Sequence, residues 1–297
     1  MLHQNGSSGE IAVSTRREFI AAAAAGIAAH TLAPRAFAKV MDRPVGVQLY
    51  TVRTLVDKDF PGTLAAIRKI GYRTVETYVA EYEMAAKDLR QAILDAGLTA
   101  PSGHFAYNDF GTRLDYAKEL GVECVVCSSV PGSVGDSADG FKRAADQYNA
   151  WGEQAKKMGL QFGFHNHNTE FKDFGGQTGI DILIQNTDPA LVGWQMDCYW
   201  VAQAGFDPVA MLKMHGKRMQ SLHLKDRKPG FPPSTDTGAA SAHFTEVGTG
   251  TLDWKTILRL AGQIGIPNMY VEQDQTELPP LESLQISYTN IEKFLNA

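Results

Sequence analysis

The chain has 297 residues, of which 44% are hydrophobic and 21% are charged, a profile typical of a globular protein. Its formal net charge is −5, and it contains no run of five basic residues. Because nucleic acids and anionic membranes attract clustered Lys and Arg, we expect neither as a main partner. The length allows one large domain or two small ones.

The N-terminal segment has the three parts of an export signal. Residues 14–20 read Ser-Thr-Arg-Arg-Glu-Phe-Ile, which resembles a twin-arginine motif, and an Ala-rich apolar stretch follows over 20–33. Residues 36–38, Ala-Phe-Ala, resemble a cleavage site. We predict a signal peptide over 1–38, a single domain over 39–297, a periplasmic location and no membrane span after cleavage, because the apolar stretch is short. An uncleaved anchor or a disordered N-terminus is the alternative. Removing 1–38 takes away three Arg and two Glu, which makes the net charge −6.

After this segment, short apolar strands alternate with longer helical patterns. The predicted strands cover 45–52, 72–79, 98–106, 122–129, 160–168, 191–199, 219–226 and 268–274, and helical spacing is seen over 63–71, 84–97, 136–159, 207–215 and 252–265. Eight strand–helix units in this length predict an α/β fold, a closed (β/α)8 TIM barrel. No Gly-x-Gly-x-x-Gly follows the first strand, which argues against a dinucleotide-binding sheet. The irregular segment 228–250 is long enough to suggest a functional loop.

Cys124 and Cys127 resemble a redox or zinc pair, but they lie in a predicted strand. Residues three apart in a strand point to opposite faces with Cα atoms roughly 10 Å apart, whereas a disulfide needs less than about 7 Å. We therefore expect both to be core residues.

Polar residues end four consecutive predicted strands. They are His165 and His167, then Asp197, then His223, then Glu272. In a barrel the strand ends meet at one rim, and strand alternation turns each of these side chains toward the axis. A carboxylate pointing inward costs several kcal/mol unless it is paired or bound to a metal. The pattern therefore predicts a divalent cation: Mn²⁺, Co²⁺, Zn²⁺, Fe²⁺ or Mg²⁺.

Several motifs resemble the xylose isomerase-like TIM-barrel superfamily of sugar isomerases and epimerases, which also includes abasic-site endonucleases of the endonuclease IV type. They are the runs 164–167 (Phe-His-Asn-His), 223–226 (His-Leu-Lys-Asp), 248–250 (Gly-Thr-Gly) and 270–272 (Tyr-Val-Glu). The resemblance covers roughly residues 44–297. It implies one metal ligand from each of the last four strands, and Asp197, His223 and Glu272 match three of them.

The fifth strand departs from the family pattern, in which many relatives carry a Glu. That position is His165, which we assign as the fourth ligand, with Glu170 as a nearby base or substrate contact; Glu170 as the ligand is the alternative. A second departure is Trp200, where relatives often have a His. Some relatives are dimers or tetramers, so a homo-oligomer is possible.

The resemblance implies carbonyl chemistry on a sugar or keto-glycoside. Glu272 and Glu170 are candidate bases, His104 a further acid or base, and Lys225 a group for a developing oxyanion. The expected substrate contacts are Glu76, His167, Trp200, Tyr199 and Phe105.

Of the reactions that can follow removal of the α-proton, we favour isomerisation or epimerisation, solely because these reactions are frequent in the superfamily. The alternative is a 3-keto-glycoside lyase that eliminates a β-leaving group. A non-catalytic sugar-binding barrel is the competing class, and net charge argues against a nuclease.

Overall fold

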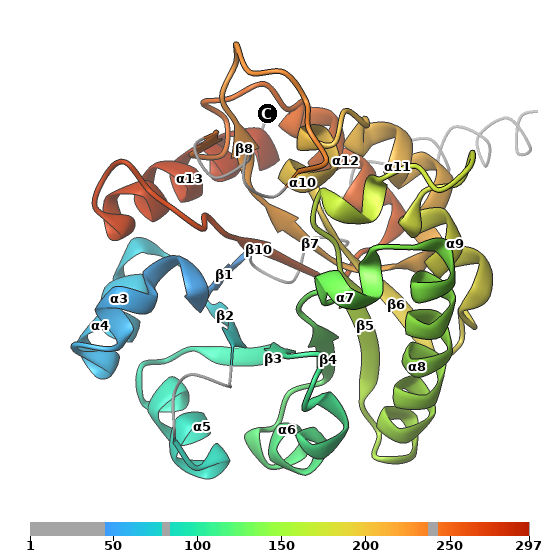
Figure 1. Cartoon of the computed structure of the whole chain (residues 1–297). Helices are drawn as coiled ribbons and strands as arrows, with labels where there is room; N and C mark the ends of the chain where they lie inside the picture. The colour runs from blue at the N-terminus through green and yellow to red at the C-terminus, as the bar shows by residue number, and fades with distance from the viewer. Residues whose placement is uncertain (1–44, 79–83, 237–242, 297) are drawn as a thin grey trace, which may run out of the picture. The chain divides into compact units, whose positions relative to one another are not determined.

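The computed structural model describes residues 45–78, 84–236 and 243–296. Within them, eight parallel strands close into a barrel in the order β1-β2-β3-β4-β5-β6-β7-β10, and helices surround it (Figure 1). The predicted TIM barrel is confirmed. The predicted signal peptide lies outside the described residues. Among the residues described, no helix is long and apolar enough to cross a membrane.

The strands are short and the helices that cover them are longer. The strands of the barrel are β1 (Gly46–Gln48), β2 (Thr74–Tyr78), β3 (Thr99–Phe105), β4 (Cys124–Cys127), β5 (Gln161–His165), β6 (Val192–Asp197), β7 (Met219–Leu224) and β10 (Asn268–Val271). The helices are α3 (Arg53–Val56), α4 (Phe60–Ile70), α5 (Ala86–Asp95), α6 (Leu114–Leu120), α7 (Gly132–Gly135), α8 (Ala138–Lys157), α9 (Gly179–Asn186), α10 (Cys198–Gln203), α11 (Pro208–His215), α12 (Trp254–Ile264) and α13 (Pro280–Leu295). Short 3-10 turns occupy Leu49–Val52, Phe110–Thr112, Thr169–Phe171 and Gly216–Arg218.

The strands end earlier than predicted, and at two of them a polar side chain caps the helical turn that follows. Asp197 accepts a hydrogen bond from the Trp200 amide at 3.0 Å, so α10 begins at Cys198. Gln48 likewise accepts from the Tyr50 amide and ends β1. The two-residue alternation therefore stops at Asp197, and Tyr199 and Trp200 lie on a helix.

The layer between strands and helices is apolar and aromatic. Phe162, Phe164 and Trp194 point outward from β5 and β6 and are fully or nearly fully buried, with Tyr148 of α8 stacked on Phe164. Burying a large apolar side chain stabilises the fold by about 1.5–3 kcal/mol. Cys124 and Cys127 are buried and form no disulfide, which confirms that they are core residues, and burial raises the pKa of Cys127 to about 12.

The side chain of a glutamine fills the barrel interior near the amino ends of β5 and β6. Gln220 is the extra residue where the pairing of β6 with β7 shifts register. Its side chain fills the space left by Gly163 and Gly193: an ideal Cβ on Gly163 would lie 2.2 Å from Gln220 Nε2, and one on Gly193 would lie 2.4 Å from Gln220 Oε1. The cavity at the other end of the barrel therefore has a packed base beneath it.

One buried carboxylate organises the loop after β7. Asp226 accepts hydrogen bonds from the amides of Gly248, Gly250 and Leu252 and from Trp254 Nε1. A Cβ on Gly250 would lie 2.3 Å from Asp226 Oδ1, so no larger residue fits there. The short antiparallel pair β8 (Asp226–Arg227) and β9 (Phe244–Thr245) begins and ends this loop. The Gly-Thr-Gly motif is thus a structural support for the rim.

Candidate metal centre

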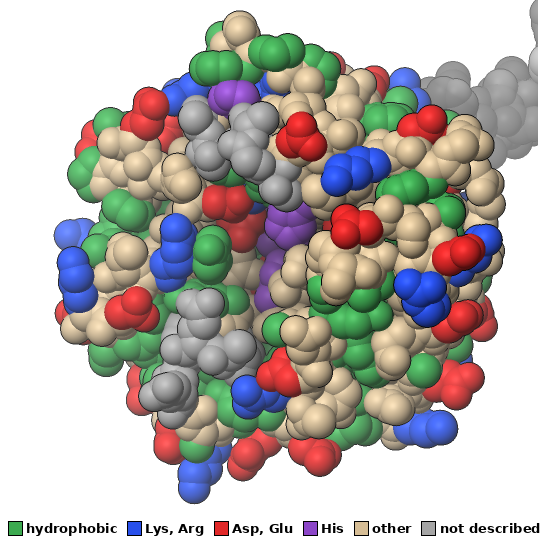
Figure 2. Space-filling view, in the orientation of Figure 1, with side chains coloured by type: hydrophobic (Ala, Val, Ile, Leu, Met, Phe, Trp, Pro, Cys, Tyr) green, Lys and Arg blue, Asp and Glu red, His purple; other side chains and the backbone are tan. Residues whose placement is uncertain are grey.

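Four inward side chains converge at the carboxyl ends of adjacent strands. They are His165 at the end of β5, Asp197 at the end of β6, His223 in β7 and Glu272 just after β10. One ligand atom of each lies within 4.8 Å of the others, and all four residues are buried. Figure 2 shows histidine side chains in a hollow in the middle of this face, with acidic side chains beside them.

The distances leave room for one ion. His165 Nε2 and His223 Nδ1 each lie 3.9 Å from Asp197 Oδ2, and His223 Nδ1 lies 2.9 Å from Glu272 Oε2. Atoms bound to a common ion at about 2.0–2.2 Å are roughly 3–4 Å apart. Asp197 Oδ2 is buried and receives no hydrogen bond from the described residues. Two imidazoles and two carboxylates that converge in this way fit a divalent cation.

Lys225 provides a positive charge next to the same carboxylates. Its Nζ lies 3.2 Å from Asp197 Oδ2, 2.8 Å from Glu272 Oε2 and 2.7 Å from Asp274 Oδ1. Burial opposes the charged form, but these carboxylates raise the pKa of Lys225 well above its ordinary value. Lys225 is 1% exposed and does not line the cavity described below. In this arrangement its ammonium lies against three carboxylates and not on the cavity surface.

Glu76 lies below the centre and is surrounded by protein donors. It accepts hydrogen bonds from Ser102 Oγ at 2.6 Å, Gln48 Nε2 at 2.9 Å and Gln195 Nε2 at 2.8 Å, and its Oε2 lies 2.6 Å from His223 Nε2. Burial alone would raise the pKa of Glu76, but His104 and His223 hold it well below its ordinary value. Glu76 is fully buried, both of its oxygens meet protein donors, and it is not among the described residues that line the cavity.

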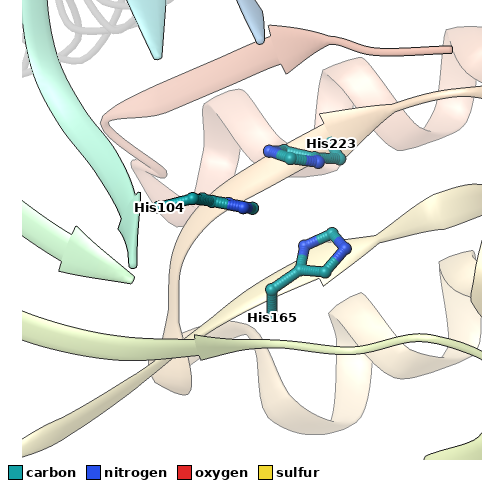
Figure 3. Close-up of side chains that lie close together, drawn as sticks. All are labelled: His104, His165 and His223. Carbon is teal, nitrogen blue, oxygen red and sulfur yellow. The ribbon is translucent and has the colours of Figure 1, made fainter. Parts of the chain in front are cut away.

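Three histidine rings meet above Glu76. The rings of His104, His165 and His223 come from β3, β5 and β7 and point toward one another (Figure 3). Their centroids are 5.2 Å apart for His104 and His165, and 4.6 Å apart for His165 and His223. His104 Nε2 lies 2.6 Å from Gln195 Oε1, so this nitrogen already has a protein partner.

A cavity of about 320 Å³ opens beside the centre, a size that suits a small molecule. Glu272 and Asp274 form one side of it, and the aromatic rings of Tyr50 and Tyr78 meet edge to face at 5.5 Å. No Lys or Arg is among its described lining residues. The lining residues are Tyr50, Tyr78, His104, Phe105, Ala106, Ser128, Ser129, His165, His167, Glu272 and Asp274.

Two of the predicted aromatic contacts lie elsewhere. Tyr199 and Trp200 form a buried cluster with Phe244, behind His167 and Lys225. Neither lines the cavity, because α10 begins at Cys198 and turns both rings away from the rim. Phe105, His104 and His167 do line it.

Glu170 also lies outside the cavity. Its carboxylate is 1% exposed and accepts hydrogen bonds from the His167 amide at 2.9 Å and the Thr169 hydroxyl at 3.0 Å. It belongs neither to the four-residue cluster nor to the cavity lining. Its contacts hold the turn that carries His167.

The sequence reasoning missed Gln195, Asp274, Tyr50 and Tyr78. The sequence could have indicated two of them, because Gln195 precedes Asp197 by two residues and Asp274 follows Glu272 by two, the spacing of residues on one face of a strand. Strand alternation places Gln195 on the inward face. Tyr50 follows β1, which ends earlier than predicted, and Tyr78 is the last residue of β2. Nothing in the spacing of either tyrosine along the sequence indicates a role in the site.

Metal binding should release a proton from His223. Burial disfavours the charged ring, but Glu272 and Glu76 raise the pKa of His223 to about 10, so the metal-free ring is protonated at neutral pH. An ion on Nδ1 must displace that proton. We expect zinc affinity to rise by up to about tenfold per pH unit below this pKa. Calorimetry in buffers of different ionisation enthalpy should show about one proton released per ion near pH 7.5. A binding heat independent of the buffer would contradict this.

Comparison with known proteins agrees with the fold. The model of the xylose isomerase-like TIM barrel family matches residues 64–284. An inosose dehydratase from Lactiplantibacillus plantarum is 33% identical over 159 residues, which are 50% of this chain and 52% of the relative. The chain thus spans about half the length of this curated relative.

Two solved structures share the fold over most of the chain. A protein from Parabacteroides distasonis described as a sugar phosphate isomerase/epimerase has a TM-score of 0.71 and 26% identity, covering 85% of this chain and 95% of its own. A protein named IolI, whose structure holds a zinc atom, has a TM-score of 0.66 and 16% identity, covering 85% and 98%. Since the family model spans most of the barrel, the chain belongs to the xylose isomerase-like TIM barrel family.

Proposed function

We propose that the protein is a metal-dependent enzyme that removes a proton beside the carbonyl of a sugar-like ketone and then expels a β-substituent, as a dehydratase or lyase. One observation favours elimination over epimerisation. Epimerisation by a pair of carboxylates needs one on each face of the substrate, but Glu170 is not among the described residues that line the cavity. The relative from Lactiplantibacillus plantarum is named an inosose dehydratase, and a dehydration is an elimination of this kind.

The barrel places Glu272 across the cavity from two histidines. Glu272 follows β10, and both β3 and β5 are three strands away from β10 around the ring. His104 on β3 and His167 after β5 therefore face Glu272 across the cavity. A base on one side and proton donors on the other are what an elimination requires.

Each step has a residue in place. A divalent ion in the four-residue centre would supply Lewis-acid polarisation of the carbonyl. Glu272 takes the α-proton, and the electron pair of the broken C–H bond forms an enolate. That pair then forms a C=C bond as the β-C–O bond breaks, and His104 or His167 gives a proton to the departing oxygen. The products are an unsaturated ketone and water or an alcohol.

The lining indicates an uncharged substrate. The acidic groups Glu272 and Asp274 face the cavity, and no Lys or Arg does so among the described lining residues. The guanidinium of Arg53 donates hydrogen bonds to the backbone carbonyls of Tyr50 and Asp274, two residues that line the cavity. A phosphate would lack the usual cationic partners, which favours a free sugar, a polyol ketone or a keto-glycoside.

The experiment that tests this proposal measures exchange of the α-proton with deuterium from the solvent. The zinc- or manganese-loaded protein would be incubated in D₂O with inosose and with 3-keto-glucosides, and NMR would detect deuterium and the unsaturated ketone. Deuterium uptake with loss of the β-substituent is the expected result. No exchange on any ketone by metal-loaded protein would overturn the proposal and favour the non-catalytic sugar-binding barrel.

Isomerisation or epimerisation is the second candidate. The Parabacteroides structure described as an isomerase/epimerase favours it, and Asp274 puts another carboxylate in the cavity. In the same experiment this reaction would give deuterated isomer or epimer without an unsaturated product.

Export to the periplasm is a separate proposal that rests on residues 14–38 alone. Residues 1–38 fused to a folded reporter should carry it to the periplasm. Replacing Arg16 and Arg17 by Lys should stop the transport, and unchanged transport would contradict a twin-arginine signal.

A further inference from the structure

A glutamine side chain under the metal centre has a fixed orientation. Gln195 Nε2 donates to Glu76 Oε1 at 2.8 Å and lies 2.9 Å from Ser221 Oγ. Because the Glu76 carboxylate can only accept, the amide nitrogen must face it. Gln195 Oε1 therefore points to the other side, toward two histidine rings.

That orientation decides which nitrogen of His165 carries a proton. Gln195 Oε1 lies 3.0 Å from His165 Nδ1, and an amide oxygen can only accept. His165 Nδ1 is therefore the protonated nitrogen, and Nε2 keeps its lone pair. This Nε2 faces Asp197 Oδ2, which is the direction of the proposed ion.

Glu76 fixes the second histidine in the opposite sense. Its Oε2 lies 2.6 Å from His223 Nε2, so this nitrogen is the donor. The other ring nitrogen, Nδ1, faces Asp197 Oδ2 and Glu272 Oε2. It is left to bind an ion once its own proton has gone.

We propose that Glu76 and Gln195 are positioning residues that assign opposite ring nitrogens to the ion, Nε2 of His165 and Nδ1 of His223. The two side chains are joined by a hydrogen bond, are fully buried, and do not line the cavity. They act only through the histidines. Losing such a partner of a ligand histidine typically weakens metal binding by about 10–100-fold. The proposal rests on the four-residue cluster being the cation site, but on no particular reaction.

Glu76→Gln tests the His223 side with almost no change in shape. The carboxylate is surrounded by donors, so the new NH₂ group must face at least one of them. Facing His223, it would force Nε2 to accept and move the ring proton to Nδ1, where the ion should bind. We expect zinc affinity to fall by about 10–100-fold.

Gln195→Met tests the His165 side, because Met keeps the volume and cannot accept a strong hydrogen bond. The same loss of affinity is expected. Gln220→Met is the matched control, since Gln220 is also a buried glutamine inside the barrel, but it contacts Gly163 and Gly193 at the opposite end. Its zinc affinity should equal that of the wild type.

The experiment uses zinc alone and needs no substrate, so its outcome does not depend on whether the proposed reaction takes place. Chelator competition gives the Kd of each variant, and two-bond ¹H–¹⁵N spectra of histidine-labelled protein show which ring nitrogen binds zinc. The zinc-loaded wild type should contain one histidine bound through Nδ1 and one through Nε2. Two ligands bound through the same nitrogen, or a Glu76→Gln protein with unchanged Kd and unchanged tautomers, would overturn the proposal. The wild-type spectrum decides the case even if Gln195→Met does not fold.

Discussion

Replacing Glu272 by Gln should lower kcat by about 10²–10⁴-fold, the usual contribution of a positioned base. The amide keeps an oxygen for the ion and the volume of the side chain, but it cannot take a proton. Lys225 and His223 hold the pKa of Glu272 well below its ordinary value against the effect of burial, so the carboxylate of the metal-free protein is ionised. The measurement is turnover of the ketone identified in the D₂O experiment, together with the metal content of the variant.

The matched control is Glu153→Gln on α8, an exposed glutamate that should leave turnover unchanged. A Glu272→Gln protein with full metal content and wild-type turnover would mean that another group takes the proton. Asp274, which also lines the cavity, would then be the candidate base. A variant that lost its metal would show instead that Glu272 is essential as a ligand, and the test of the base would move to single-turnover exchange at saturating zinc.

Replacing Lys225 by Met should destabilise the metal-free protein by about 3–5 kcal/mol. Its ammonium contacts three carboxylates, two of them almost completely buried. Removing one partner of a buried ion pair leaves the other charges uncompensated. A bound divalent ion supplies positive charge at Asp197 and Glu272, so zinc should stabilise Lys225→Met more than it stabilises the wild type.

Urea unfolding with a chelator and with zinc measures both effects. Lys228→Met is the control, because Lys228 pairs with the exposed Glu277 and such a surface pair contributes only about 0–1 kcal/mol. Equal loss of stability in both variants, or a zinc effect no larger than in the wild type, would mean that Lys225 does not balance the charge of the metal ligands.

The barrel and the cluster of four could be predicted from the sequence because both depend on short-range patterns. Alternating strands and helices require a parallel sheet, and parallel strands bring their carboxyl ends to one rim. The two-residue period of a strand then turns His165, Asp197 and His223 inward. These rules need only the order of residues along each strand, and the structure places the side chains accordingly.

The partner of each polar side chain was decided only by the tertiary structure. Glu76 meets His223 across 147 residues of sequence, and Lys225 meets Asp274 across 49. Periodicity says which face a side chain occupies, but a hydrogen bond depends on distances across the closed barrel, and a local cap can end the periodicity, as at Asp197. The sequence by itself determined that His, Asp and Glu side chains meet at one rim, close enough together to hold an ion. The packing of the interior decided their neighbours: Glu76 and Gln195 contact histidine rings, Lys225 contacts three carboxylates, and Glu170 contacts the turn at His167.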